Sequence, residues 1–252
     1  MPDTVSLPMY RFLISPRWIA LHVLIGALVA LMVNLGFWQL NRLDERKALN
    51  THVTKQIAAP VADFGDSVTS RLDADEAEWR LVRLQGTYVS NEMVLIVNRS
   101  QNGAAGRDVV MPLLLADGRK ILVNRGFIPL TVDIPPSPTG EVTVVGHVRP
   151  TQKRSGLGAI DSADGTLAEM QRIDIARIDQ QTAGSLEALY VQLVESIPAE
   201  TLLSVVPLPD ITNGPHLSYA FQWFFFSAVA LFGWVFVVRR KVSEASQATT
   251  SA

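Results

Sequence analysis

Histidine is the residue type in this sequence that is best suited to chemistry near neutral pH. Four histidines are present, His22, His52, His147 and His216. A neutral imidazole can accept a proton, accept a hydrogen bond or bind a metal ion. No two of the four lie three or four residues apart, the spacing that places two ligands on one helical face. We therefore expect no zinc-type site built from neighbouring histidines.

His216 has the most informative surroundings, because it lies in NGPHLSYAFQWF at the start of an apolar run. We expect Gly214 to cap a helix that begins there. In the first helical turn, the positive end of the helix dipole disfavours the imidazolium and keeps the ring neutral. A rotation of 100° per residue places the imidazole on one helical face with Tyr219, Ala220 and Trp223.

This face admits two interpretations. An imidazole above an aromatic and small-residue groove at a membrane surface can bind the iron of a flat, hydrophobic macrocycle such as haem. The alternative is an interfacial histidine beside a belt of aromatic residues, which is routine where a helix leaves a bilayer. The residue pattern leaves both open. Apart from haem iron at His216, we expect no metal site.

The first apolar run ends in a comparable group of residues, GFWQLNRLDERK. Gly36 allows close approach of a second helix, and Gln39 can form a hydrogen bond within the membrane interface. Arg42 can extend toward haem propionates or lipid phosphates. The alternative interpretation is general membrane anchoring, with Trp38 in an aromatic belt and Arg42 and Lys47 on lipid headgroups.

Composition excludes several classes of function. Cysteine is absent, which excludes disulfides, thiolate metal sites, iron–sulfur clusters and a cysteine nucleophile. The 22 basic and 24 acidic residues give a net charge of −2, which does not favour a nucleic-acid partner. A nucleophile elbow, a phosphate-binding loop and a dinucleotide fingerprint are missing. We therefore expect neither an enzyme nor a nucleic-acid-binding protein.

Two uncharged apolar runs are long enough to cross a bilayer core of about 30 Å. They predict transmembrane helices over residues 18–41 and 215–238. Within the first helix, His22 lies near the end opposite to Gln39, and we expect it to form a buried polar contact. The two helices also make the lipid bilayer itself a partner.

The orientation of these helices follows from Arg239, Arg240 and Lys241 after the second run. The positive-inside rule places this cluster in the cytoplasm, and two spans bring both termini to the same side. We therefore expect a multi-pass protein of a bacterial plasma membrane. Its cytoplasmic tails, residues 1–17 and 239–252, are short, and the small polar residues from Ser243 onward predict no structure.

Residues 42–214 then form one extracytoplasmic domain. Alternating or strand-length apolar segments predict strands over residues 80–88, 93–99, 108–115, 120–128, 141–149 and 189–195. Asp117 and Gly118 predict a two-residue hairpin turn between the third and fourth of these. Residues 151–165 form a polar loop, and residues 175–182 a short helix. The fold class is an α+β membrane protein, with two transmembrane helices flanking a β-rich, mostly antiparallel domain.

Three segments together resemble signature segments of the Surfeit-locus-one family, and they occur in the family's order: GFWQLNRLDERK, GRDVVMPLLLADGRKILVNRGFIP and NGPHLSYAFQWF. Members of that family are assembly factors for haem–copper cytochrome c oxidase. The resemblance implies a role in maturing the catalytic subunit, by receiving or presenting haem a transiently. The implied partners are the oxidase subunits, chiefly the haem-bearing catalytic subunit, and also a haem a synthesis enzyme.

Individual family positions carry over onto matching residues of this sequence. They are Gly36, Trp38, Gln39, Arg42 and Lys47; Pro112, Gly118, Arg125, Gly126 and Pro129; and His216, Tyr219, Ala220 and Trp223. His216 matches the haem-linked position. Asn124 departs from the family, which often has an acidic residue there, and the long polar loop near residues 155–165 is a second departure.

Our leading hypothesis is a non-enzymatic assembly factor that contacts haem a through His216, Tyr219, Trp223, Trp38, Gln39 and Arg42. In this hypothesis, Arg125, Gly126 and Lys47 contribute to docking on oxidase subunits. A second hypothesis is a structural docking protein that stabilises an oxidase intermediate or supercomplex without haem, in which His216 only packs. A sensor or receptor is less favoured, because the tails are too short to form an output domain.

Overall fold

The computed structural model describes residues 7–65, 76–154, 156 and 158–250. The chain divides into two compact units, one made of residues 1–50 and 211–252 and the other of residues 51–210. The first unit is helical and the second is built on a β-sheet, which confirms the α+β class. Parts of the predicted tails (residues 1–6 and 251–252) and of the polar loop (155 and 157) lie outside the described residues.

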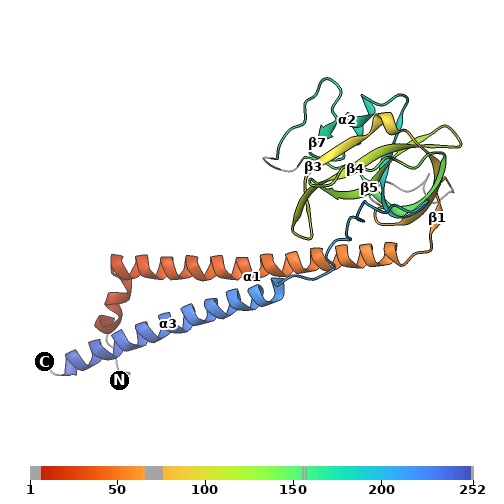
Figure 1. Cartoon of the computed structure of the whole chain (residues 1–252). Helices are drawn as coiled ribbons and strands as arrows, with labels where there is room; N and C mark the ends of the chain where they lie inside the picture. Colours follow the sequence, from red (N-terminus) through yellow and green to blue (C-terminus); the bar gives the residue numbers. More distant parts are fainter. Residues whose placement is uncertain (1–6, 66–75, 155, 157, 251–252) are drawn as a thin grey trace. The chain divides into compact units, whose positions relative to one another are not determined.

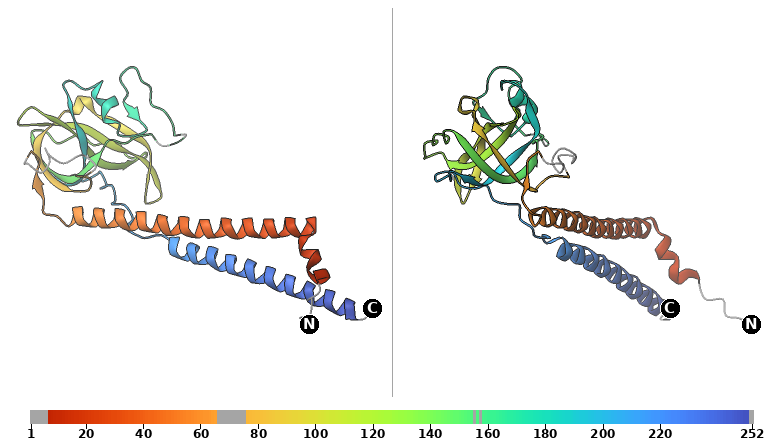
Figure 2. Two further views of the ribbon diagram at one scale, coloured as in Figure 1. Left: turned by 180° about the vertical axis from the view of Figure 1, so that it is seen from behind. Right: turned by 90° about the vertical axis from the view of Figure 1, so that its right-hand side faces the viewer.

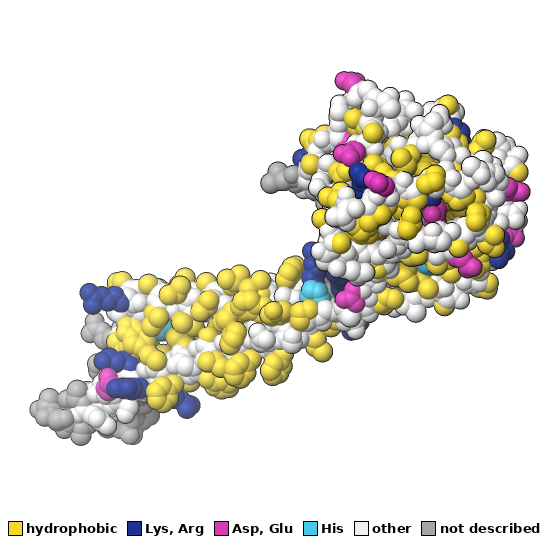
Figure 3. Space-filling model, in the orientation of Figure 1, with side chains coloured by type: hydrophobic (Ala, Val, Ile, Leu, Met, Phe, Trp, Pro, Cys, Tyr) yellow, Lys and Arg dark blue, Asp and Glu magenta, His cyan; other side chains and the backbone are white. Residues whose placement is uncertain are grey.

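The helical unit contains two long helices and one short one (Figure 1). The 3-10 helix η1 spans Leu7–Ile14, α1 spans Pro16–Ile57 and α3 spans His216–Thr250. Helices α1 and α3 are each long and apolar enough to cross a membrane. Hydrophobic side chains cover the visible face of both helices, with Lys and Arg near the ends of that face (Figure 3).

Both helices extend beyond the apolar runs from which they were predicted. The 42 residues of α1 span about 60 Å at 1.5 Å per residue, roughly twice the thickness of a bilayer core. The prediction of unstructured tails is wrong for the described residues, because η1 forms before α1 and α3 continues to Thr250. In α3, Glu244 accepts hydrogen bonds from Arg240 at 3.0 Å and from Lys241 at 3.2 Å, which favours the added turns.

The described part of the sheet unit contains eight strands and one short α-helix. They are β1 (Ala62–Asp63), β2 (Leu81–Tyr88), β3 (Val94–Gln101), β4 (Ala104–Leu115), β5 (Lys120–Pro129), β6 (Glu141–Pro150), β7 (Glu169–Met170), α2 (Ile175–Asp179) and β8 (Leu186–Ile197), with a 3-10 turn η2 (Ser90–Glu92). The strand order is β1-β2-β6-β8-β5-β4-β3-β7. An additional pairing of β2 with β4 closes strands β2, β6, β8, β5 and β4 into a barrel (Figure 2).

Apolar residues cover both faces of the barrel wall. Along β4, Val109, Met111 and Leu113 belong to a first core, whereas Val110 belongs to a second. Successive strand residues point to opposite faces, so the first core lies inside the barrel and the second outside it. The outer core is covered by α2, through buried Ile175 and Ile178.

Most predicted elements of this domain are confirmed. The six predicted strands correspond to β2, β3, β4, β5, β6 and β8, the short helix to α2, and five of the eight strand pairings are antiparallel. The hairpin between β4 and β5 is also confirmed, but not its two-residue turn. Leu115 N–H donates to Arg119 O at 2.9 Å, which encloses three residues, and Gly118 has φ +85°. This is a three-residue loop with glycine at the left-handed position.

Candidate functional site

The imidazole of His216 is held by a hydrogen bond between the two long helices. Its Nδ1 lies 2.8 Å from Oε1 of Gln39 on α1. An amide oxygen can only accept, so Nδ1 carries the proton, and the neutral ring keeps its lone pair on Nε2. In metal sites, a hydrogen bond from the ring nitrogen that does not bind the metal fixes the tautomer and orientation of the histidine. The ring is therefore prepared to bind a metal ion through Nε2.

Gly214 keeps the space beside this nitrogen open. A Cβ atom at position 214 would lie 3.4 Å from both Nε2 and Cδ2 of His216. Any larger side chain would extend from that point over the ligating edge of the ring. Gly214 also has φ +63°, in the left-handed region that glycine adopts without strain. Glycine at this position therefore places no side chain against Nε2.

Close packing beside the bond fixes the register of the two helices. At Gly36, a Cβ atom would lie 2.6 Å from Cε1 of Phe224, so only glycine lets the Phe224 ring approach this closely. The ring of Phe37 packs edge-on against that of Phe224, with centroids 5.4 Å apart. Ala220, one turn after His216, is 2% exposed. These contacts place Gln39 opposite His216.

A cavity of about 390 Å³ lies beside the imidazole. It is lined by Arg42, Glu45, Arg46, Leu49 and His216. Arg42 forms an ion pair with Glu45 at 2.6 Å. The cavity combines two guanidinium groups with an imidazole, a set that suits a metal-bearing ligand with acidic substituents.

Arg42 also stacks over the ring of Trp38, with 5.7 Å between the guanidinium carbon and the ring centroid. Trp38 is 50% exposed and Tyr219 is 46% exposed, so both rings are accessible rather than packed between the helices. Trp223 is half-buried, and its ring is edge-on to Phe226 with centroids 6.5 Å apart. The structure thus brings His216, Gln39 and Arg42 to one place, with the three aromatic residues nearby on the same two helices.

Sequence reasoning missed Glu45, Arg46 and Leu49, which line the cavity. The charges after Asn41 marked the end of a span, and nothing marked the continuation of α1 to Ile57. Helical spacing offered a signal, because Arg42, Arg46 and Leu49 follow one another at intervals of four and three residues. Lys47 is part of a different contact, 3.6 Å from Asp44.

A second polar contact links the two helices near their other end. Trp234 Nε1–H donates a hydrogen bond of 3.1 Å to Nδ1 of His22. Trp18 packs on the same imidazole, with ring centroids 5.7 Å apart. The polar contact predicted for His22 is confirmed, although it is only partly buried, and His22 does not share a site with His216.

The sheet unit places Arg125 in its interior rather than on a docking surface. Arg125 is 1% exposed, so its side chain offers no surface to a partner, and the docking role predicted for it needs correction. Its Nε and Nη2 donate to the carboxylate of Glu200 at 2.6 and 2.9 Å, and its guanidinium lies 5.4 Å from the centroid of the Tyr88 ring. This paired arginine holds the segment after β8 against the barrel.

Gly126 supports the same contact. It has φ +137°, and a Cβ atom there would lie 2.6 Å from the carbonyl oxygen of Ser204. The next residue, Phe127, exchanges two backbone hydrogen bonds with Ser204, at 2.8 and 2.9 Å. Arg125 and Gly126 thus hold the segment around Glu200 and Ser204 against the barrel, which is a structural role.

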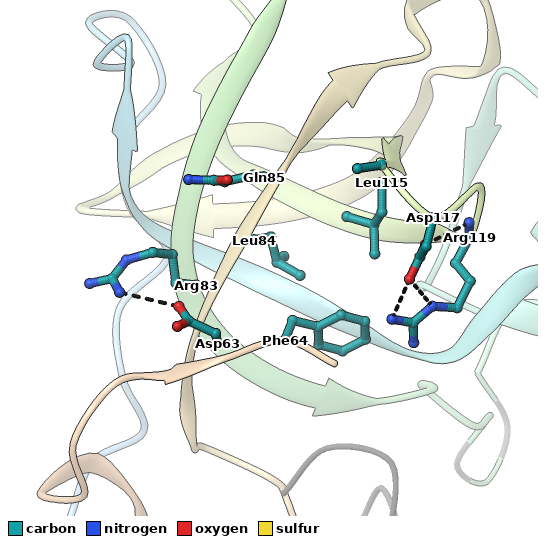
Figure 4. A pocket seen from close by; sticks show the side chains of 9 residues that line it. Asp63, Phe64, Arg83, Leu84, Gln85, Leu115, Asp117 and Arg119 are labelled. Atoms are coloured by element: carbon teal, nitrogen blue, oxygen red, sulfur yellow. Dashed lines mark hydrogen bonds and ion pairs between the residues drawn. The ribbon is translucent and has the colours of Figure 1, made fainter. Parts of the chain in front are cut away.

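The sheet unit has a hollow of about 430 Å³, shown in Figure 4. Asp63 pairs with Arg83 at 3.2 Å, and Asp117 pairs with Arg119 at 2.7 Å. The guanidinium of Arg119 lies 5.3 Å from the centroid of the Phe64 ring. The charged side chains that line the hollow pair with one another, and Asp63 and Phe64 belong to the segment around β1, so we assign the hollow to attaching that segment.

Comparison with known proteins agrees with this architecture. The model of the SURF1 family matches residues 26–228. A SURF1-like protein of Mycobacterium tuberculosis is 27% identical over 234 residues, which cover 90% of this chain and 85% of the relative. A SURF1-like protein of Monosiga brevicollis is 27% identical and covers 82% and 83%, and one of Rickettsia felis is 25% identical and covers 77% and 86%.

The fold and the comparisons define a class of protein, one in which two candidate membrane helices flank a β-rich domain. Within this class, the chain belongs to the SURF1 family. The Surfeit-locus-one resemblance noted in the sequence is thereby confirmed.

Proposed function

We propose that this protein is a non-enzymatic membrane assembly factor for haem–copper cytochrome c oxidase. In this proposal it holds haem a transiently before the haem enters the catalytic subunit. Membership of the SURF1 family supports the assembly role. The observation that carries the haem role is the His216–Gln39 hydrogen bond, because it leaves the lone pair on Nε2 beside the open position at Gly214.

The residues present fit a haem. His216 would bind the iron through Nε2, and Arg42 and Arg46 at the adjacent cavity would pair with the propionates. Trp38, Tyr219 and Trp223 provide apolar ring surface on the same two helices for the macrocycle. When bound, the haem supplies only its iron coordination and its hydrophobic face, since the protein carries it as cargo.

The proposal includes an orientation in a bacterial plasma membrane. Arg239, Arg240 and Lys241 follow the apolar part of α3, and the positive-inside rule counts Lys and Arg rather than net charge. Glu244 pairs with Arg240 and Lys241, but this pairing does not change the predicted orientation. The C-terminal end of α3 and the η1 segment would face the cytoplasm, and the sheet unit would lie outside it and dock on oxidase subunits.

The assembly role is testable in a bacterium that makes haem a and lacks its own copy of this gene. Complementation with the wild type is expected to restore the haem a content of the purified oxidase. Complementation with His216→Ala is expected to leave that content low, whereas His22→Ala is a matched control and is expected to restore it.

Equal restoration by the wild type and His216→Ala would contradict the haem role while leaving an assembly role in place. Failure of the wild type to raise the yield or haem content of the oxidase would contradict the assembly role itself. Levels of each variant in the membrane, measured by immunoblotting, separate both results from a failure to fold.

A further inference from the structure

Two adjoining cavities on the sheet unit carry an excess of positive side chains. The first, of about 340 Å³, is lined among others by Trp79, Arg99, Arg149 and Tyr190. The second, of about 450 Å³, is lined in part by Arg99, Arg149, Gln152, Lys153 and Arg172. The two share Arg99, Arg149 and Gln152. Among the described residues that line them, Asp108 is the one carboxylate against four cationic side chains; Asp161, which pairs with Arg172 at 3.6 Å, lies outside both linings.

Gln152 links Arg99 to Tyr190 through two hydrogen bonds. Arg99 Nη2 donates to Gln152 Oε1 at 3.1 Å, and Gln152 Nε2 donates to the Tyr190 hydroxyl at 3.1 Å. Arg149 on β6 stands directly opposite Tyr190 on β8 in the strand register. The Tyr190 oxygen already accepts a bond, so its own O–H remains to donate. Burial raises the pKa of Tyr190, which keeps this proton in place.

Both guanidinium groups are held by ion pairs as well as by the contacts described above. The Nε atoms of Arg99 and Arg149 are buried and have no hydrogen-bond partner. Their carboxylate neighbours are ion-pair contacts, with Asp108 at 3.5 Å from Arg99 and Glu78 at 3.3 Å from Arg149. The Nε of Arg99 is the atom that faces Asp108, so these contacts fix both arginines in place where they line the two cavities.

Trp79 adds backbone strain at this point. It has φ +73°, a conformation that is rare for a bulky residue and that clusters at binding sites. Its carbonyl oxygen is hydrogen-bonded to Nδ1 of His147 at 2.9 Å, which holds the strained residue in place. The guanidinium of Arg149 stacks 3.6 Å from the centroid of the Trp79 ring. Trp79 therefore fixes Arg149 in one orientation before any ligand arrives.

We propose that Arg99, Arg149 and Tyr190 form a binding site for an oxyanion, a phosphate or carboxylate carried by a free small molecule or by a lipid headgroup. This site is in the sheet unit and is independent of the haem role of His216. Arginine suits both groups, because its planar guanidinium offers paired N–H donors to two oxygens at once. The cavity volumes are those of small-molecule sites.

The test is isothermal titration of the full-length protein in an uncharged detergent with three probes: inorganic phosphate, succinate and dihexanoyl phosphatidate. We expect saturable binding of at least one probe. Arg149→Gln is expected to weaken that binding about tenfold or more, since it removes a charged donor. Tyr190→Phe, which removes only the hydroxyl, is expected to weaken it about threefold to tenfold.

Arg107→Gln is the matched control. Arg107 also has a buried Nε without a hydrogen-bond partner and pairs with a carboxylate, Glu169 at 3.8 Å, but it lines neither cavity. It is expected to bind the probe as the wild type does. Binding of a soluble probe would identify a free anion as the source, and binding of phosphatidate alone a lipid headgroup.

The proposal is overturned if no probe binds saturably to the wild type, or if Arg107→Gln weakens binding as much as Arg149→Gln. It is also overturned if Tyr190→Phe and Arg149→Gln both remain folded, by their thermal unfolding midpoints, and bind as the wild type does.

Discussion

His216 and His22 lie near opposite ends of the same pair of helices, and each is hydrogen-bonded to the other helix. Nδ1 of His216 meets Gln39 at 2.8 Å, and Nδ1 of His22 meets Trp234 at 3.1 Å. The partners have opposite chemistry. An amide oxygen accepts a hydrogen bond from Nδ1–H, whereas an indole N–H can only donate a hydrogen bond to an unprotonated Nδ1. Nε2 therefore keeps its lone pair in His216 and carries the proton in His22.

The hydrogen-bond partner from the other helix, Gln39 for His216 and Trp234 for His22, thus sets which ring nitrogen of each histidine carries the proton. His216 can bind iron, and Gly214 leaves its Nε2 open. His22 can only donate from Nε2, and its ring packs against Trp18 and Trp234. We interpret the His22 end as a structural link and the His216 end as the ligand site. The first three predictions below each change one end of the helix pair, and the fourth concerns the sheet unit.

The largest expected effect is that of Gln39→Leu on haem affinity. The substitution removes the acceptor that fixes the His216 tautomer. Loss of such a hydrogen-bond partner typically lowers metal affinity by roughly 10- to 100-fold. The measurement is haem titration of the purified protein, followed by absorption. Trp234→Phe at the other end is the control and is expected to leave the affinity unchanged; equal losses in both variants would show that only helix packing matters.

Gly36→Val is expected to lower the stability of the helix pair by about 1–3 kcal/mol, because a side chain at position 36 overlaps the Phe224 ring. The measurement is unfolding in mixed micelles of increasing SDS content. Gly26→Val is the matched control, since nothing lies within 4 Å of a Cβ atom at position 26. Similar unfolding curves for the two variants would mean that Gly36 is not at a close contact.

Trp234→Phe is expected to have a smaller effect on the same unfolding curve. It removes one interhelical hydrogen bond to His22, and such bonds contribute about 0.6 kcal/mol on average in a membrane. A decrease above about 2 kcal/mol would contradict the assignment of this contact as a modest structural link.

The smallest expected effect concerns pH and a third histidine, His147 in the sheet unit. Burial lowers the pKa of His147; the hydrogen bond to Trp79 O opposes this, and the charge of Arg149 adds to it. Below the ordinary pKa of about 6.5, the unfolded state binds a proton that the folded state does not, so stability falls as pH falls. The thermal midpoint of the wild type should therefore drop more between pH 7 and 5 than that of His147→Asn. A larger drop in the variant would contradict this sign.

The sequence predicted what depends on local pattern. Strand-length apolar or alternating segments were sufficient for six strands, and the cap signal at Gly214 placed His216 in the first turn of α3. Closure of the barrel was not predictable in this way, because β2 pairs with β4 through contacts between distant segments. The parallel pairing of β5 with β8 also joins distant segments.

The site was predicted only in part, because its contacts also join residues that are far apart in the sequence. Gln39 was expected at the end of the first apolar run and His216 at the start of the second, but their bond spans 177 positions and leaves no trace in either local pattern. Arg125 was expected to contribute to docking, as one of the positions carried over from the family resemblance. Its burial depends on Glu200, 75 positions away, and no local signal connects the two residues.

The central claim is that Nε2 of His216, and not of His22, is the nitrogen that binds haem. The most direct test is the absorption spectrum, with pigment extraction, of the purified wild type, His216→Ala and His22→Ala from a host that makes haem a. The account predicts haem a in the wild type and in His22→Ala, and its loss from folded His216→Ala. Haem a retained by His216→Ala, or lost only from His22→Ala, would contradict it.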